Sequence, residues 1–236
     1  MDLAGNLELI RGRIRAAAEG CGRRPEDVQL VAVTKSVGPD TILSLFNIGQ
    51  NIMAESRPQA LRDRANLLTG KPIRWHFIGP LQTNKVKYVY PIAEMVHSID
   101  REDLIEEFGR WAQKTGRKTP FLLEVHISPE PTKQGLEPKH LLRLIERIRN
   151  RPDLDVRGLM GLAPYVEDRQ AIRSSFQLLA GLLKESRALE GPAYRASELS
   201  MGMSDDYDIA IEEGATMVRI GTALFEDGND AVPEEP

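Results

Sequence analysis

Cysteine is almost absent from this chain: Cys21 is the only one among 236 residues. A single thiol excludes an internal disulfide and every zinc site built from several cysteines. Long apolar runs are absent too, since no stretch approaches the roughly 18 uncharged apolar residues that a membrane-spanning helix needs. Charged residues interrupt the first part of the chain, where a secretory signal would require an apolar stretch. We therefore expect a cytoplasmic protein whose fold is stabilised by packing.

Neither sign of charge is in large excess, because 31 Lys and Arg stand against 35 Asp and Glu, a net charge of -4. The overall field therefore gives no reason to expect nucleic acid or an anionic membrane as a partner. The basic stretch 143–151 has the leucine and isoleucine spacing of an amphipathic helix, and we favour a solvated helix face there over a nucleic-acid patch. Residues 227–236 are acidic and end in proline, so we expect a disordered tail after one domain of residues 1–226.

Apolar, β-branched stretches alternate with stretches of helical periodicity along the chain. The expected strands are 29–35, 51–55, 73–78, 95–99, 121–127, 156–162, 196–200 and 217–220. The expected helices, after one at the N-terminus, are 41–48, 58–68, 82–90, 101–115, 138–149, 169–189 and 205–213.

This alternation predicts a parallel sheet with right-handed crossovers. Eight strands in a chain close to the roughly 250 residues typical of such folds predict an α/β protein, a single (β/α)8 barrel of TIM type. An open doubly wound sheet is the alternative. No helical pattern follows the last strand, so an extra N-terminal helix, with Leu3, Leu7, Ile10 and Ile14 on one face, should cover that part of the wall.

Lys35 follows the first strand, and in such barrels the active site lies at the carboxyl ends of the strands. It shares strand parity with Val31 and Val33, so we expect apolar surroundings for its stem. A desolvated lysine loses its proton more easily, and the neutral amine is the nucleophile that forms Schiff bases with carbonyls. The alternative is a strand-end lysine in an ion pair.

The segment after the seventh strand and the end of the eighth contain small residues suited to binding phosphate. Ser200, Gly202 and Ser204 precede an expected helix, and Gly221 and Thr222 follow the last strand. Small residues leave backbone N–H groups accessible to a phosphate, although ordinary turn glycines and a helix N-cap would give the same pattern. A lysine opposite two phosphate-binding segments suits a ligand with an aldehyde and a phosphate, such as pyridoxal 5'-phosphate. Arg219 would then meet the ring nitrogen.

Motifs along nearly the whole chain resemble those of the pyridoxal phosphate homeostasis protein family, also called the proline synthetase co-transcribed homologue family. The matching segments are VAVTK, GQNIMAES, WHFIGPLQTNK, EVHISPEPTKQG, GLMGLAP and LSMGMSDDYDIAIEEGATMVRIGTALF. The resemblance implies a barrel similar to the N-terminal domain of alanine racemases, with the cofactor held as an internal aldimine on Lys35. It implies that Ser200, Gly202, Gly221 and Thr222 bind the phosphate and that Arg219 faces the pyridine nitrogen. It also places Asn51 and Met203 near the cofactor.

Three residues depart from the pattern of this family. Val37 stands where a second lysine is usual, Gln50 replaces a glutamate, and Pro80 replaces a histidine. Accessory roles of the usual residues therefore do not transfer to this chain.

We expect a monomeric protein that buffers or delivers pyridoxal phosphate in vitamin B6 homeostasis, with apo-forms of pyridoxal phosphate enzymes as partners and no committed turnover. The chain ends soon after its last phosphate motif, leaving no room for the second domain of alanine racemases, which supplies a catalytic tyrosine. We expect Tyr165 and Tyr207 not to replace that tyrosine. A pyridoxal-phosphate-dependent amino-acid enzyme, such as a racemase, is the alternative.

A metal-dependent hydrolase is the remote alternative, with His76, His97 and His126 near strand ends and Glu55 or Glu124 completing the site. Separately, Lys133, in the loop 132–135 after the fifth strand, is a candidate secondary contact for cofactor transfer. A solvated loop lysine is the competing interpretation.

Overall fold

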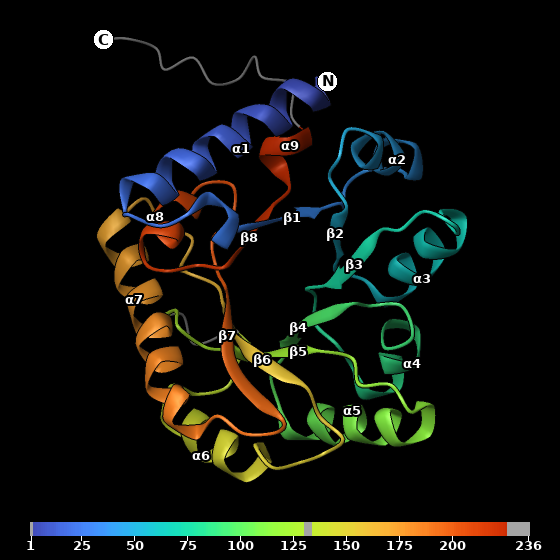
Figure 1. Cartoon of the computed structure of the whole chain (residues 1–236), viewed down its shortest axis with the longest axis vertical. Coiled ribbons are helices and arrows are strands. Elements are labelled where there is room, and N and C mark those ends of the chain that lie inside the picture. The colour runs from blue at the N-terminus through green and yellow to red at the C-terminus, as the bar shows by residue number, and fades with distance from the viewer. Residues whose placement is uncertain (1, 130–133, 226–236) are drawn as a thin grey trace.

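Eight parallel strands close into a barrel in which each strand pairs with the next and β8 pairs back to β1 (Figure 1). The structure is a computed structural model, and it describes residues 2–129 and 134–225. Across the closing pair, Gln29 aligns with Met217 and Ala32 with Ile220. The strands are β1 (Gln29–Val33), β2 (Ile52–Glu55), β3 (Arg74–Phe77), β4 (Met95–Ile99), β5 (Phe121–Val125), β6 (Val156–Gly161), β7 (Tyr194–Ser200) and β8 (Met217–Ile220). This topology confirms the predicted barrel and is not that of an open doubly wound sheet.

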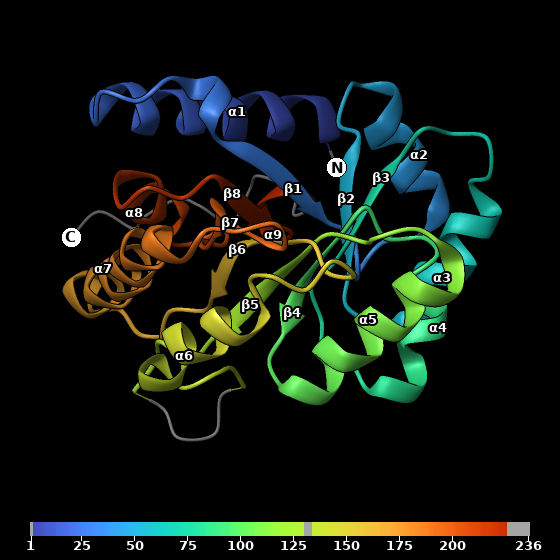
Figure 2. The same cartoon turned by 60° about the horizontal axis from the view of Figure 1, so that its bottom comes forward.

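Helices connect the strands and cover the outside of the barrel (Figure 2). They are α1 (Leu3–Gly20), α2 (Pro39–Asn47), α3 (Pro58–Leu67), α4 (Val86–Val89), α5 (Glu102–Thr115), α6 (Pro138–Ile148), α7 (Arg169–Ser186), α8 (Tyr207–Glu212) and α9 (Thr222–Phe225), with 3-10 helices at Pro25–Asp27, Thr83–Lys85 and Arg187–Leu189. Proline at the first helical position begins α2, α3 and α6, where its missing N–H costs no helical hydrogen bond. No helix in the described ranges is both long and apolar enough to cross a membrane.

Helix α1 covers the barrel wall beside the closing pair of strands. It packs against α8, α9 and α2 (Figure 1). Its buried face consists of Leu7, Ile10, Ile14 and Ala18. The predicted covering role of the N-terminal helix is thereby confirmed.

Four local predictions were wrong. A short helix, α9, does follow the last strand, and the helix expected at 82–90 begins as a 3-10 turn before α4. Strand β1 ends at Val33, so Lys35 lies in the following turn. Helix α8 begins at Tyr207 because Asp206 is its N-cap residue and its carboxylate accepts a hydrogen bond from the Met203 N–H at 2.6 Å, which keeps residues 203–206 in a turn. The expected tail at 227–236 lies outside the described residues.

The barrel interior is apolar at one level and polar at another. Val31, Ile52, Ala54 and Met217 form a small apolar cluster inside the barrel. The alternate residues of the strands face outward and pack with the helices in the main core. The interior also holds buried polar side chains from several strands, namely His76, His97, Glu124, Ser200 and Arg219. Buried polar groups need partners, so this polar level is a candidate functional region.

Candidate functional site

A cavity of about 460 Å³ opens at the carboxyl ends of the strands. It is bordered by the turn after β1, the ends of β2, β3 and β6, the loop between β7 and α8, and the end of β8. The lining residues are Val33, Lys35, Ser36, Ser56, Ile78, Gly79, Pro80, Met160, Leu162, Met203, Ser204, Asp205, Arg219, Gly221 and Thr222. Five of the eight residues predicted from the sequence therefore meet here, from both ends of the chain: Lys35, Met203, Arg219, Gly221 and Thr222.

Lys35 is exposed in a tight turn at the cavity rim. The turn is closed by the Val37 N–H, which donates to the Thr34 carbonyl at 3.1 Å. The expectation of a desolvated stem was wrong because β1 ends two residues earlier, so the strand parity does not continue to Lys35. The alternative of a lysine in an ion pair has no support either, because no described residue forms one with it. The amine can therefore reach into the cavity.

Arg219 is almost completely buried beneath the cavity, 3% exposed. Its Nη1 donates to Ser200 Oγ at 2.6 Å, and its Nη2 donates to the Gly161 carbonyl at 3.0 Å. Its backbone N–H donates to the Gly202 carbonyl at 2.9 Å, which ties β8 to the segment after β7. These bonds fix a guanidinium at the floor of the cavity.

A chain of hydrogen bonds continues from Arg219 across the barrel. Ser200 Oγ lies 2.8 Å from His97 Nδ1, and His97 Nε2 lies 2.9 Å from His76 Nδ1. Because the guanidinium can only donate, the simplest consistent arrangement has the serine hydroxyl donate to His97 and the Nε2–H of His97 donate to His76. Both imidazoles are then neutral, each with its proton on Nε2.

Burial lowers the pKa of both imidazoles, in agreement with the neutral forms that the hydrogen bonds require. It lowers the pKa of His76 to about 4 and that of His97 well below its ordinary value, so both are neutral at pH 7. Burial also lowers the pKa of Arg219 to about 10, which leaves it a cation. Burial raises the pKa of Glu124 to about 7, Asp100 adds to this effect, and the charge of Arg219 opposes it.

The segment after β7 turns sharply at Gly202, where φ is +91°. A Cβ at this position would lie 2.6 Å from the Cβ of Ala210 and 2.9 Å from the Cα of Tyr207, so glycine allows α8 to approach the strand end. Met203, 39% exposed, and Ser204 then line the cavity. Gly202 and Ser200 do not line it themselves.

Ser200 is fully buried, and its hydroxyl serves Arg219 and His97. In this structure it supports the guanidinium, and its contact with phosphate stays a prediction. The end of β8 is open to the cavity at Gly221 and Thr222, and the Ala223 N–H donates to Ser204 Oγ at 3.4 Å. The two segments predicted to bind phosphate are therefore adjacent.

Asn51 lies elsewhere. It is exposed and precedes β2, so it sits at the amino end of that strand, away from the cavity. The Gln50 side chain, at the same end, donates from Nε2 to the carbonyls of Leu30 and Ile52, both at 2.8 Å. The prediction that Asn51 borders the cofactor is not supported. Of the three departures from the family pattern, Pro80 alone lines the cavity.

Neither tyrosine considered as a catalytic base is poised beside Lys35 in the cavity. Tyr207 is buried in the core, 5% exposed, and its hydroxyl interacts with Arg13. Tyr165 is 88% exposed in the loop after β6 and borders a smaller hollow that it shares with Met203. The packing role expected for Tyr207 agrees with its burial.

The histidines proposed as metal ligands do converge in part, but their nitrogens bind each other. His76 and His97 are hydrogen-bonded, whereas His126 lines a different hollow. Within residues 2–129 and 134–225, no group of three or more His, Cys, Asp or Glu side chains is arranged to hold a metal ion. This geometry does not support the metal-dependent alternative. Lys133 lies outside the described residues.

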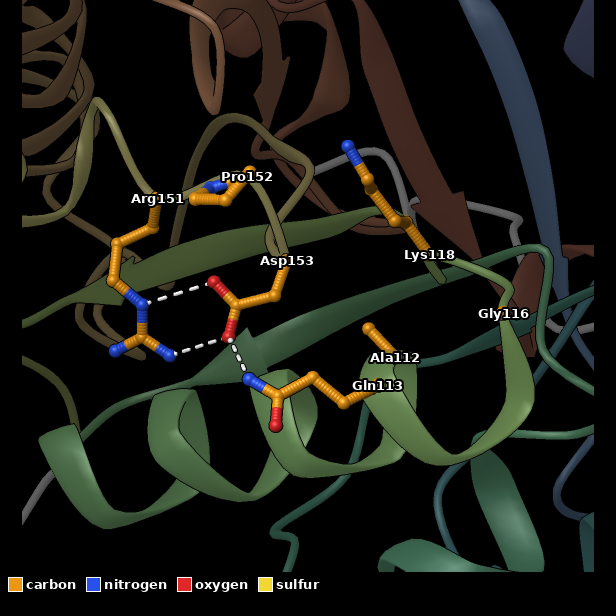
Figure 3. A pocket seen from close by; sticks show the side chains of 7 residues that line it. All are labelled: Ala112, Gln113, Gly116, Lys118, Arg151, Pro152 and Asp153. Atoms are coloured by element: carbon orange, nitrogen blue, oxygen red, sulfur yellow. Dashed lines mark hydrogen bonds and ion pairs between the residues drawn. The ribbon is translucent and has the colours of Figure 1, made fainter.

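A second cavity, of about 500 Å³, lies at the opposite end of the barrel, before β5 and β6 (Figure 3). Arg151 there forms a bidentate ion pair with Asp153, in which Nε donates to Oδ1 at 3.0 Å and Nη2 donates to Oδ2 at 2.8 Å. Gln113 donates to the same carboxylate at 3.3 Å, and Lys118 points away from it in the figure. The polar groups thus satisfy one another, and we assign no ligand to this cavity.

The chain is similar in sequence and in fold to proteins of known families and structures. A family described as "Alanine racemase, N-terminal domain" matches residues 6–228. The pyridoxal phosphate homeostasis protein of Aquifex aeolicus is 39% identical over 225 residues, which cover 95% of this chain and 98% of that protein. PipY of Synechococcus elongatus PCC7942, solved with pyridoxal phosphate bound, has a TM-score of 0.84 and 30% identity, covering 95% of this chain and 100% of PipY. Alanine racemase from Streptomyces lavendulae shares the fold, with a TM-score of 0.66 and 16% identity, over 94% of this chain and 56% of the racemase.

Proposed function

Because the chain belongs to the pyridoxal phosphate homeostasis protein family, within the wider family of the alanine racemase N-terminal domain, we propose that it binds pyridoxal 5'-phosphate and acts in vitamin B6 homeostasis. It would buffer the cofactor or deliver it to other proteins. The relative PipY is described with this cofactor bound, which supports the proposal.

One cavity combines the three groups that this cofactor requires, and that combination is the main support. Lys35 offers a primary amine at the rim and Arg219 a guanidinium at the floor. The hydroxyls and backbone of two segments, Met203–Ser204 and Gly221–Thr222, line the same cavity. These groups match an aldehyde, an aromatic nitrogen and a phosphate, in that order. The donor set therefore fits the cofactor.

The roles follow from the chemistry of each group. Lys35 Nζ would add to the aldehyde carbon and release water to form a Schiff base. Gly202, Gly221, Thr222 and Ser200 would hold the phosphate, with Met203 beside the cofactor. Arg219, which remains a cation, would face the pyridine nitrogen and disfavour its protonation, which weakens the ring as an electron sink. A cofactor held in this way is suited to storage more than to turnover.

We further propose that the protein works as a monomer in the cytoplasm, with apo-forms of pyridoxal phosphate enzymes as recipients and without nucleic acid as a partner. The small net charge of -4 agrees with the proposal that nucleic acid is not a partner.

The first test is the visible absorption of protein incubated with pyridoxal phosphate, followed by borohydride reduction and peptide mass spectrometry. We expect a pyridoxyl group on Lys35 that is lost in Lys35→Ala. Lys118→Ala is the matched control, because Lys118 is also exposed and lines a cavity of similar size at the other end of the barrel. A protein without specific absorbance, or an adduct spread equally over both lysines, would refute the assignment.

A second experiment separates storage from amino-acid chemistry. The loaded protein is mixed with each enantiomer of alanine in deuterium oxide, and α-proton exchange is followed by NMR. In parallel, transfer of cofactor to an apo-aminotransferase is followed by recovery of the aminotransferase activity. Transfer without exchange supports storage and delivery, whereas exchange at enzymatic rates supports the alternative of an amino-acid enzyme.

A further inference from the structure

The turn that carries Lys35 is held from outside the cavity by a buried ion pair, Glu55 with Arg64. Glu55 ends β2, and its side chain is 1% exposed. Arg64 comes from the last turn of α3, and its side chain is 16% exposed. Neither residue lines the cavity. From the sequence, Glu55 was expected only as a ligand in the metal-dependent alternative, and Arg64 was not expected at the site.

Arg64 binds the turn on both sides of Lys35. Its Nη1 donates to the Thr34 carbonyl and its Nη2 to the Val37 carbonyl, each at 2.6 Å. The planar guanidinium thus spans the two ends of the four-residue turn, which a single-point donor such as lysine cannot do.

Glu55 completes the arrangement from the neighbouring strand. Its Oε1 accepts from Arg64 Nη1 and from Thr34 Oγ1, the latter at 2.5 Å. The Thr34 N–H also donates to the Ala54 carbonyl at 3.0 Å, so the residue before Lys35 is fixed through backbone and side chain together. A buried carboxylate needs such partners, because an unpaired charge there would be strongly unfavourable.

Lys35 itself has no hydrogen bond or ion pair with the described residues, so only its backbone determines where its amine can reach. A flexible four-carbon stem on a mobile turn would sample much of the cavity mouth, whereas the same stem on a fixed turn reaches a smaller region. We propose that Glu55 and Arg64 are positioning residues that hold the Lys35 turn so that Nζ meets the carbonyl of a phosphate-bearing aldehyde. This inference rests on the proposed function.

The test compares affinities for two ligands that differ only in the reacting group. Pyridoxal 5'-phosphate has the aldehyde, and pyridoxine 5'-phosphate has an alcohol in its place but the same ring and phosphate. The wild-type protein should prefer the aldehyde because only the aldehyde reacts with Lys35. In Arg64→Lys, which keeps the charge beside Glu55 but loses the two-point contact, we expect this preference to fall about tenfold while pyridoxine phosphate affinity stays within about twofold.

Two further variants make the result specific. Thr34→Val removes only the hydroxyl that donates to Glu55 and should lower the preference in the same direction while the fold is kept. Arg173→Lys is the matched control, because the Arg173 guanidinium also makes a two-point contact, here with the carboxylates of Glu212 at 2.5 Å and Glu213 at 2.6 Å, but lies on α7 away from Lys35. It should leave the preference unchanged.

An unchanged preference in Arg64→Lys and Thr34→Val would overturn the positioning role. An equal loss of affinity for both ligands would also overturn it, because it would show a general structural effect. If the wild-type protein shows no preference for the aldehyde over the alcohol, and Lys35→Ala does not change this, the Schiff base is absent. The assignment of Lys35 in the proposed function then fails together with this inference.

Discussion

The imidazoles of His97 and His76 are hydrogen-bonded inside the barrel, with His97 Nε2 2.9 Å from His76 Nδ1. Through Ser200, this pair is connected to Arg219. Two neutral rings can share one proton between these nitrogens, but two cations cannot, because both would then be donors. The hydrogen bond thus excludes the doubly charged pair, and burial, which lowers the pKa of both rings, keeps each of them neutral beside the guanidinium.

We expect neither of these two histidines to titrate above pH 5, since burial lowers the pKa of His76 to about 4 and lowers that of His97 well below its ordinary value. Nitrogen-15 NMR from pH 8 to pH 5 should show His97 with its proton on Nε2 and an unprotonated Nδ1 throughout. His97→Asn assigns the signals. A shift of either ring to the cationic form between pH 7 and 6 would contradict this arrangement.

Glu124→Gln should stabilise the protein at pH 8. Burial raises the folded-state pKa of Glu124 from 4.5 to about 7, so between these values the folded state binds more protons than the unfolded state, and stability falls as pH rises. At about 1.4 kcal/mol for each pKa unit, the neutral amide should gain about 1 to 3 kcal/mol above pH 7 and little below pH 4.5. Urea unfolding at pH 4.5 and pH 8 measures this difference, with the exposed Glu146→Gln as control. A gain that does not depend on pH would count against the explanation.

Gly202→Ala should destabilise the fold more than Gly214→Ala. Both glycines have positive φ, +91° and +101°, and share the cost of about 1 to 2 kcal/mol for a side chain in that conformation. Only Gly202 also meets neighbouring atoms, Ala210 and Tyr207, which adds about 1 to 3 kcal/mol for overpacking. Denaturant unfolding of the two variants gives the comparison. Equal losses would show that α8 can move away from the strand end.

Gln50→Glu should lower stability at pH 7 by about 2 kcal/mol, although glutamate is the usual residue of the family at this position. The Gln50 amide donates to two carbonyls, and an ionised carboxylate can donate to neither. Cofactor affinity should not change, because Gln50 lies at the end of the barrel opposite the cavity. A variant as stable as the wild type would mean that Arg11, whose Nη2 is 3.3 Å from Gln50 Oε1, compensates fully.

The sequence patterns predicted the barrel and most of its elements, because hydrophobic periodicity and the glycine and proline residues that begin or end helices and strands are local properties. They also predicted that Lys35, Arg219 and Thr222 meet, since strand ends of a parallel barrel share one face. For Asn51 the motif resemblance and the geometry differ, because the residue precedes its strand and so lies at the end of the barrel opposite the cavity.

What the sequence could not show was which side chains meet across the barrel. His76 and His97 were expected near each other, but whether their nitrogens face a metal, a ligand or one another depends on ring orientations set by packing. Glu55 and Arg64 are nine residues apart, yet their joint contact with the turn after β1 depends on how α3 packs beside that strand. Long-range side-chain geometry of this kind leaves no periodic signal.

The covering of the barrel wall by α1 has a consequence for the order of folding. The apolar face of Leu7, Ile10 and Ile14 is synthesised early, but α8 and α9, against which it packs, are synthesised only near the other end of the described chain. The residues Gln29 and Met217, which pair β1 with β8, are equally far apart in sequence. Forming either the helix contact or the strand pair therefore costs the entropy of closing a loop that contains almost the whole fold. During synthesis this helix therefore exposes an unsatisfied apolar surface until the barrel closes, and its docking and the closure should occur as one late, cooperative event.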